Sequence, residues 1–274
     1  MMGSTALLAW IVLQRLSSVL SSSMEVLKEV PTPAAESQIG QAQSRLGTIR
    51  DANSYEAFVH IPIAAAGQQL PLLLYLHGGG EMGGPLSGLL SEGATGTPPV
   101  ELHAGRALPI LRDRFIMVAP HAEYVGWEPR RLLAFVEFLL SPASSGLHID
   151  ARRLYVTGHS LGGSGALRVA AERPGGVFAA VAPVAPAGSV QASRLTKTAV
   201  WAFHGRNDEV VPYSYSEDLI NELRELKVPE DEARLTLYEE APTPPGWPDS
   251  VGHASTIPAY STEELYIWLL QHSL

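Results

Sequence analysis

Seven apolar runs recur along the chain between residues 55 and 238, and they are the first sign of its architecture. They cover residues 55–61, 72–76, 115–119, 154–157, 178–184, 200–203 and 235–238. The runs near residues 72, 115 and 154 are almost wholly apolar, as expected of parallel strands buried on both faces. We therefore predict a β-strand at each run.

Helical patterns fill several of the gaps between these runs. Residues 129–140 carry a broad apolar stripe at helical spacing. A second helix is predicted after residue 160, ending near Pro174. Two further helices are expected to open with capping boxes, Ser214-x-x-Glu217 and Ser261-x-x-Glu264. Strands that alternate with helices predict an α/β fold, a mostly parallel, doubly wound sheet flanked by helices in one domain.

Two segments lack periodicity. Residues 83–109 are rich in Gly, Pro, Ser and Thr, and long loops of this kind are lids, binding loops or disordered segments. Residues 241–250 contain four prolines and precede His253. A stiff approach to this histidine would help to hold it in place, although proline-rich surface loops without a role are equally common.

The N-terminal 50 residues stand apart from this pattern. Residues 6–13 are apolar, but no Lys or Arg precedes them, and residues 31–44 resemble a linker. We predict a non-catalytic extension or helix over residues 1–50 and a catalytic domain over residues 51–274. Soluble, cytoplasmic placement is slightly favoured, with a signal peptide or an organelle transit peptide as alternatives.

Composition narrows the possible partners. The formal net charge is −9, and no Lys/Arg cluster is present, which argues against nucleic acid and anionic lipid as partners. No apolar run is long enough to span a membrane as a helix. The sequence has no cysteine, which excludes disulfides, thiolate zinc sites and a cysteine nucleophile. The oligomeric state is left open.

The candidate nucleophile is Ser160, in the sequence Gly-His-Ser-Leu-Gly (158–162) between a predicted strand and a predicted helix. A G-x-S-x-G motif in this context forms a nucleophile elbow, a tight turn that lifts the serine hydroxyl clear of the sheet. The turn also aims the backbone N–H of Leu161 at the position where an oxyanion would form. A glycine-rich turn that happens to hold a serine is the plain alternative.

A second motif, His-Gly-Gly-Gly (77–80), follows the predicted strand at residues 72–76. Glycines there let the backbone approach a substrate and donate the second oxyanion-hole N–H. Gly79 is the first choice of donor and Gly80 the second, while His77 is expected to pin the loop rather than to react.

A serine nucleophile needs a base, and the base needs a carboxylate that orients it. In the chain order of this motif the acid and then the histidine follow the serine. The candidate acid is Asp208, just after the run at 200–203, and Glu209 and Asp249 are the fallback acids. The alternative interpretation of Asp208 is an aspartate that only caps a helix or stabilises a turn. His253 is the histidine that remains after the others are sorted by position, because it lies between the last predicted strand and the last predicted helix.

Several segments resemble the family of predicted peptidases within the esterase branch that includes feruloyl and acetyl-xylan esterases and polyhydroxybutyrate depolymerases. They are HGGGEMGG (77–84), VAP (within 115–120), DARRLYVTGHSLGG (150–163), FAAVAPVAP (178–186), VWAFHGRNDEVVP (200–212) and HASTIPAYSTEELYIWLL (253–270). The resemblance spans about residues 54–271 and implies a single-domain α/β-hydrolase fold with a Ser160–Asp208–His253 triad. One departure concerns the residues after the histidine, where members commonly have Asp-Ser-Trp and this chain has Ala254-Ser255-Thr256. Loss of that aromatic could widen the acyl pocket.

The resulting hypothesis is a serine esterase that acts on small acyl, feruloyl or acetyl-type esters through an acyl-enzyme, without cofactor or metal. Alternatives within the hydrolases are a lysophospholipase or thioesterase and a peptidase. From a different class, the chain could be an inactive hydrolase-fold protein that binds a small ligand or a partner.

Overall fold

The structure is a computed structural model that describes residues 46–52, 54–63, 68–123 and 126–274. The elements described below all belong to one compact unit of the chain, Ser44–Leu274. The predicted N-terminal helix, with its possible targeting signal, and the linker over residues 31–44 lie outside the described residues.

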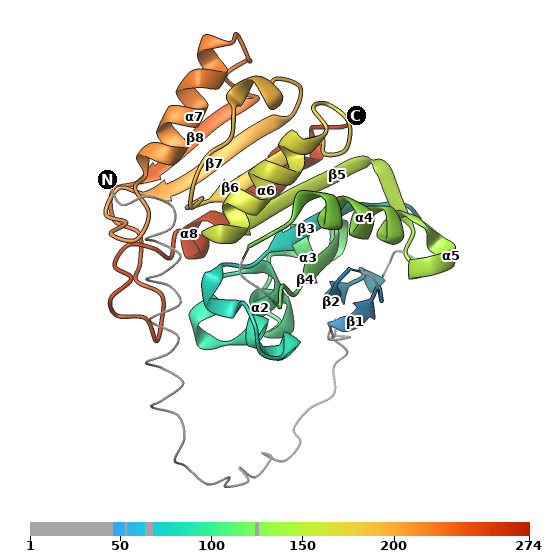
Figure 1. The fold of residues 1–274 in the computed structure, drawn as a ribbon. Coiled ribbons are helices and arrows are strands. Elements are labelled where there is room, and N and C mark those ends of the chain that lie inside the picture. The colour runs from blue at the N-terminus through green and yellow to red at the C-terminus, as the bar shows by residue number, and fades with distance from the viewer. Residues whose placement is uncertain (1–45, 53, 64–67, 124–125) are drawn as a thin grey trace, which may run out of the picture. The chain divides into compact units, whose positions relative to one another are not determined.

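The described residues form an eight-stranded sheet in the order β1-β2-β4-β3-β5-β6-β7-β8 (Figure 1). Strands β1 and β2 are antiparallel to their neighbours, and β3 through β8 run parallel to one another. The strands are β1 (Gly47–Arg50), β2 (Glu56–His60), β3 (Leu70–Leu76), β4 (Ile116–Pro120), β5 (Ile149–His159), β6 (Ala180–Val184), β7 (Ala199–Gly205) and β8 (Ala233–Tyr238). All seven predicted strands are therefore confirmed, in a mostly parallel sheet.

Burial explains which strands the sequence pattern revealed. Every residue of β4, β6 and β7 is buried, and in β3 only Leu70 is partly exposed. Strand β1 was not predicted, because an exposed edge strand needs no apolar run to pair with its neighbour. The sheet thus includes Gly47–Arg50, upstream of the boundary predicted between residues 50 and 51.

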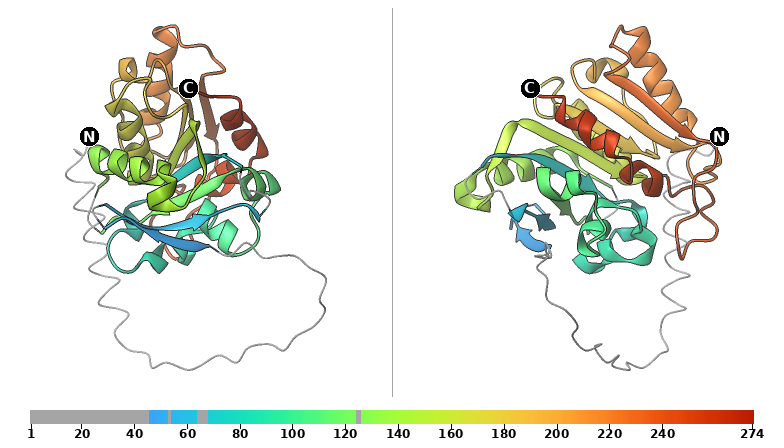
Figure 2. Two further views of the ribbon diagram at one scale, coloured as in Figure 1. Left: turned by 90° about the vertical axis from the view of Figure 1, so that its right-hand side faces the viewer. Right: turned by 180° about the vertical axis from the view of Figure 1, so that it is seen from behind.

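Helices cover both faces of the sheet. One face carries α4 (Pro129–Leu140), α6 (Leu161–Glu172) and α7 (Ser214–Glu225), and the view from behind shows α8 (Thr256–Tyr260) and α9 (Glu263–Leu270) on the other (Figure 2). The helix predicted over residues 129–140 matches α4, and the helix predicted after residue 160 is α6. The remaining short helices are α2 (Pro98–His103), α3 (Pro109–Arg114) and α5 (Pro142–Ser145).

The two predicted capping boxes are wrong, although both helices exist. Ser214 is the first residue of α7 rather than its cap, and Thr262 rather than Ser261 precedes α9. Neither helix has a side-chain cap hydrogen bond, and the Ser261 hydroxyl donates instead to the carbonyl of Pro258 at 3.1 Å. A capping box requires the serine to stand outside the helix in extended backbone, and the turn before α9 places that position one residue later.

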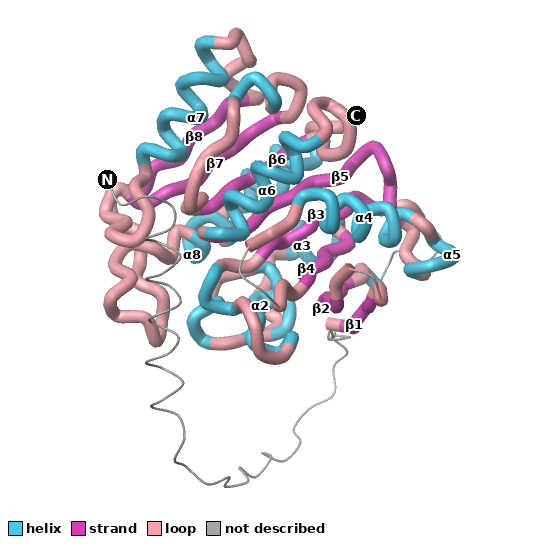
Figure 3. Tube along the Cα trace, viewed as in Figure 1, coloured by secondary structure: helices cyan, strands magenta, loops and turns pink. Residues whose placement is uncertain are grey.

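The segment over residues 83–109 is not irregular throughout. It contains the 3-10 helices η3 (Leu86–Leu90) and η4 (Glu92–Ala94) and the helix α2, all too short to produce a helical hydrophobic pattern. The proline-rich residues 241–250 do lie in a loop between β8 and α8, as predicted (Figure 3). None of the described helices is both long and apolar enough to cross a membrane.

Candidate active site

Ser160 occupies a strained turn between β5, which ends at His159, and α6, which begins at Leu161. Its backbone has φ 55° and ψ −116°, a conformation that non-glycine residues rarely adopt, and its side chain is almost fully buried. Such outliers persist only where the surroundings enforce them, and they concentrate at functional sites. The turn has the geometry predicted for a nucleophile elbow.

The flanking glycines allow this turn to pack against the neighbouring strand. A Cβ on Gly158 would lie 2.5 Å from the carbonyl oxygens of both Leu76 and Gly162. At Gly162 a Cβ would collide with the carbonyl of Leu76 itself. The motif needs glycine at both positions because backbone occupies the space a side chain would take.

The glycine loop after β3 lies against this turn. It forms the short 3-10 helix η2 (Gly79–Glu81), and a Cβ on Gly78 would lie 3.4 Å from both Nδ1 and the carbonyl oxygen of His159. Leu161 is the first residue of α6, where backbone N–H groups have no partner within the helix. The loop and the start of α6 therefore adjoin Ser160, as an oxyanion hole requires.

His77 holds the glycine loop in place, as predicted. Its Nε2 accepts a hydrogen bond from the backbone N–H of Ala122 at 2.9 Å, so Nδ1 carries the proton and donates to the carbonyl of Gly78 at 2.8 Å. The indole of Trp127 donates to the His77 carbonyl at 3.1 Å. The side chain and backbone of His77 thus tie the loop to the segment that follows β4.

Asp208 and His253 meet across the end of β7. Asp208 Oδ2 lies 2.7 Å from His253 Nδ1, and Oδ1 accepts the backbone N–H groups of Val210 and Val211 at 2.9 and 2.8 Å. Burial by itself raises the pKa of Asp208. The charge of His253 and hydrogen bonds from His204, His253 and Val211 more than offset this, and the pKa lies well below its usual value. The fallback acids Glu209 and Asp249 are both exposed, so the carboxylate paired with His253 is that of Asp208.

A second histidine contacts the same carboxylate. His204 is fully buried, and its Nε2 lies 3.1 Å from the carbonyl of Val211 and 3.4 Å from Asp208 Oδ2. Its Nδ1 pairs with the hydroxyl of Ser216 at 2.8 Å. His204 therefore packs at the end of β7 and helps to hold Asp208 in place.

Sequence reasoning missed the role of His159, the variable residue of the motif directly before Ser160. Its Nε2–H donates to the backbone carbonyl of His253 at 2.7 Å, and the centroids of the two rings are 4.6 Å apart. Burial, and then the neighbouring His253, lower the pKa of His159 to about 3, so the ring is neutral at physiological pH. The sequence offered only the position of His159 directly before Ser160 as a signal of this role. That position does not show that the side chain turns toward a loop 94 residues away.

These contacts bring His253 to the nucleophile elbow. Within the described part of the chain, no hydrogen bond joins the Ser160 hydroxyl to His253, and the link runs through His159. Gly252, with φ +72°, supplies the left-handed turn before His253, and a Cβ there would collide with the backbone of Asn207. The three residues after the histidine, Ala254, Ser255 and Thr256, are all buried.

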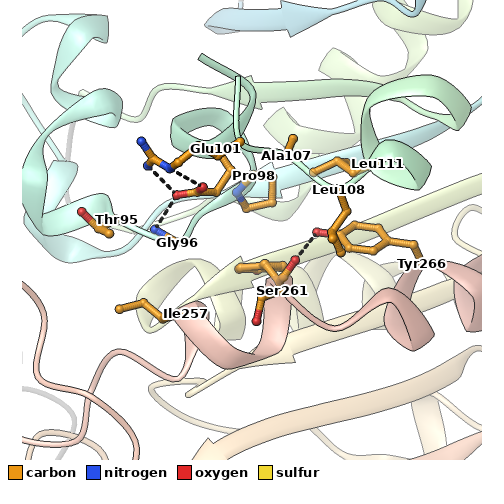
Figure 4. A pocket seen from close by; sticks show the side chains of 12 residues that line it. Thr95, Gly96, Pro98, Glu101, Ala107, Leu108, Leu111, Ile257, Ser261 and Tyr266 are labelled. Atoms are coloured by element: carbon orange, nitrogen blue, oxygen red, sulfur yellow. Dashed lines mark hydrogen bonds and ion pairs between the residues drawn. The ribbon is translucent and has the colours of Figure 1, made fainter. Parts of the chain in front are cut away.

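An apolar cavity lies away from these residues. It measures about 400 Å³ and separates the segment before α3 from α8 and α9 (Figure 4). Its lining includes Pro98, Leu108, Ile257 and Tyr266, and none of the predicted site residues. The described residues also contain no group of three His, Asp or Glu side chains arranged to hold a metal ion.

The strand order, the elbow at Ser160 and the helices on both faces define the α/β-hydrolase fold, which confirms the predicted fold class. No known protein-family model matches the chain. Two curated relatives, Cutinase est1 and Cutinase est2 of Thermobifida alba, are each 37% identical over 91 residues, 31% of this chain and 30% of the relative.

Solved structures match over more of the chain. A thermostable esterase superposes with a TM-score of 0.68 and 25% identity, over 85% of this chain and 64% of that one. A putative dienelactone hydrolase from Klebsiella pneumoniae subsp. pneumoniae (TM-score 0.56, 17% identity, 79% of this chain and 93% of that one) shares the fold. A ferulic acid esterase also shares the fold (TM-score 0.55, 18% identity, 83% of this chain and 97% of that one). The chain thus spans less than a third of the length of the cutinases it matches, and less than two thirds of the thermostable esterase.

Proposed function

We propose that this protein is a serine hydrolase that cleaves carboxylic esters, with Ser160 as nucleophile, His253 as general base and Asp208 as the acid that orients the base. The observation that carries the proposal is the 2.7 Å pair between Asp208 and His253, set beside the strained turn of Ser160. An ionised carboxylate on Nδ1 fixes the tautomer that leaves Nε2 free to accept a proton.

In the first half of the proposed reaction, His253 Nε2 takes the proton of the Ser160 hydroxyl as its oxygen attacks the ester carbonyl. The step requires the hydroxyl to come within hydrogen-bonding distance of Nε2, and catalytic hydrogen bonds often tighten only when substrate binds. His253 then gives the proton to the leaving alcohol, and an acyl-enzyme remains on Ser160.

The oxyanion formed in each half-reaction would be held by backbone N–H groups. Leu161 supplies one donor, and Gly79, with Gly80 as second choice, supplies the other. In the second half, His253 takes a proton from water, hydroxide attacks the acyl-enzyme, and the proton returns to Ser160 as the acid leaves. No step uses a metal or a cofactor, and one oxyanion donor is worth about 10²–10³ in turnover.

For substrates, we propose esters with small acyl groups or feruloyl and acetyl esters. The thermostable esterase and the ferulic acid esterase among the structural matches and the two cutinases support an ester substrate. A panel of p-nitrophenyl esters of increasing chain length, with methyl ferulate, distinguishes these classes. A preference for long chains would instead indicate a lysophospholipase or a thioesterase.

A fluorophosphonate probe tests the nucleophile directly. Wild-type protein should be labelled at Ser160, while Ser160→Ala should not be labelled and should lose about 10⁶-fold in turnover. Ser164→Ala is the matched control, one helical turn further along α6, and should be labelled like the wild type. Absence of labelling in folded wild-type protein would contradict the proposal and favour an inactive binding protein with a hydrolase fold.

A further inference from the structure

The side chain of Trp247 reaches from the proline-rich loop to the glycine loop beside Ser160. A Cβ built on Gly80 would lie 3.3 Å from Trp247 Cζ2, and one built on Gly93 would lie 2.5 Å from Trp247 Nε1. The indole therefore lies directly beside both glycines, in the space that a side chain at either position would need. One belongs to η2, where the proposed oxyanion donors are, and the other to η4.

The loop that carries Trp247 is fixed at its base. The amide of Asn207, next to Asp208, pairs with Ala241 in both directions, at 3.0 and 2.8 Å. The backbone N–H of Ala254 donates to the carbonyl of Pro242 at 2.9 Å. With prolines restricting the backbone between these anchors, the loop has little freedom to move.

A series of turns connects Trp247 to His253. Trp247 N–H donates to the Pro244 carbonyl at 3.1 Å, Ser250 N–H to the Trp247 carbonyl at 3.0 Å, and His253 N–H to the Ser250 carbonyl at 3.1 Å. The base and the indole are therefore parts of one hydrogen-bonded segment. The indole end of this segment meets the glycine loop, which has no side chains of its own at residues 78–80 with which to anchor itself.

We infer that Trp247 is a positioning residue that clamps the oxyanion loop in register with the loop that carries His253. The inference rests on the proposed function. Oxyanion donors act only if they are held within a fraction of an ångström of the developing charge. His77 pins the start of the glycine loop, and without the indole the part of the loop at Gly80 would lose that placement. Trp247, the aromatic residue of this clamp, precedes His253 in the chain. Residues 254–256, which follow the histidine, are buried.

Steady-state kinetics with p-nitrophenyl acetate can test the clamp. Trp247→Ala should lower kcat by roughly 10- to 100-fold, the cost of a misplaced catalytic group, with KM changed less than about threefold. Trp247→Phe, which keeps an aromatic ring over Gly80, should recover most of the loss. A purely structural role would lower thermal stability without this split between kcat and KM.

Gly93 makes a second, independent test possible. Gly93→Ala should reproduce the loss of kcat, because its Cβ displaces the indole, and it should add nothing in a Trp247→Ala background, where the indole is absent. Gly88→Ala is the matched control in the same segment, because no atom lies within 4 Å of its Cβ, and it should behave as wild type. Losses that multiply in the double variant would overturn the inference.

Amide hydrogen exchange separates this inference from the proposed function. In Trp247→Ala, peptides that cover residues 77–82 should exchange faster than in wild type, while peptides of the central strands should not change. Unchanged exchange over residues 77–82 would overturn the clamp whether or not the protein hydrolyses esters. Wild-type protein without fluorophosphonate labelling would overturn the proposed function alone.

Discussion

The two halves of the candidate site are built from different kinds of interaction. The acid–base half, around Asp208 and His253, is held by hydrogen bonds and charge among buried polar side chains. The oxyanion half, around Ser160 and residues 78–80, is shaped by backbone strain and by glycines that exclude side chains. Changes in the first half should alter charge, tautomer and pH dependence, whereas changes in the second should act through volume and position.

Apart from the loss of the nucleophile itself, the largest effect is expected in the acid–base half. Asp208→Asn keeps the size of the side chain but removes the charge and can favour the wrong tautomer of His253, so kcat should fall by about 10⁴-fold. Asp249→Asn and Glu209→Gln, at the two exposed fallback acids, are the controls and should remain near wild type in the same esterase assay. A larger loss of kcat in either control than in Asp208→Asn would assign the role of the acid to that control residue instead.

The oxyanion half should respond to a single methyl group. Gly78 has φ −77°, which any residue adopts, so alanine is not excluded by its backbone. Its Cβ would press on Glu81 and His159 at 3.3 to 3.4 Å, and the loop must shift to accommodate it. We expect kcat to fall roughly 10- to 100-fold with little change in thermal stability. If KM rather than kcat changes, the loop shapes binding and not the oxyanion hole.

A smaller effect is expected behind the acid. Ser216→Ala removes the partner of His204 Nδ1 and leaves a buried ring nitrogen unsatisfied, which should cost about 1–3 kcal/mol in the free energy of unfolding. Ser214→Ala, two residues earlier in α7, is the control, and it should change stability by less than about 0.5 kcal/mol because its hydroxyl caps nothing. Chemical denaturation measures both. Equal effects would show that the His204–Ser216 pair does not stabilise the fold.

The smallest effect at neutral pH is expected for His159→Gln, which can retain a donor toward His253. The pKa of His159 in the folded protein, about 3, lies below the value near 6.5 of an unfolded chain, so the unfolded state binds more protons between these values. The stability associated with neutral His159 is therefore complete above pH 6.5 and is lost as the pH falls toward 3, by at most about 1.4 kcal/mol per pH unit. The variant should show a flatter decline of unfolding free energy over this range. An unchanged slope would mean that His159 does not titrate as its burial implies.

The sequence by itself determined the parts of this protein that depend on local chemistry. Buried parallel strands must be apolar throughout, and the apolar stripe of α4 must follow helical spacing, so these elements could be read from residues 72–76, 115–119 and 129–140. The elbow at Ser160 could be predicted because the turn excludes side chains at Gly158 and Gly162. Glycines therefore stand at a fixed spacing on either side of the serine.

Only the tertiary structure decided how distant segments meet. The pairing of Asp208 with His253, the turn of His159 toward the loop of His253 and the contact of Trp247 with Gly80 and Gly93 join residues far apart in sequence. Strand β1 escaped prediction for a related reason, because backbone pairing stabilises an edge strand without a side-chain pattern. The spacing of residues along the chain reflects interactions between residues that are close in sequence. Contacts across the fold depend instead on where the sheet places each loop.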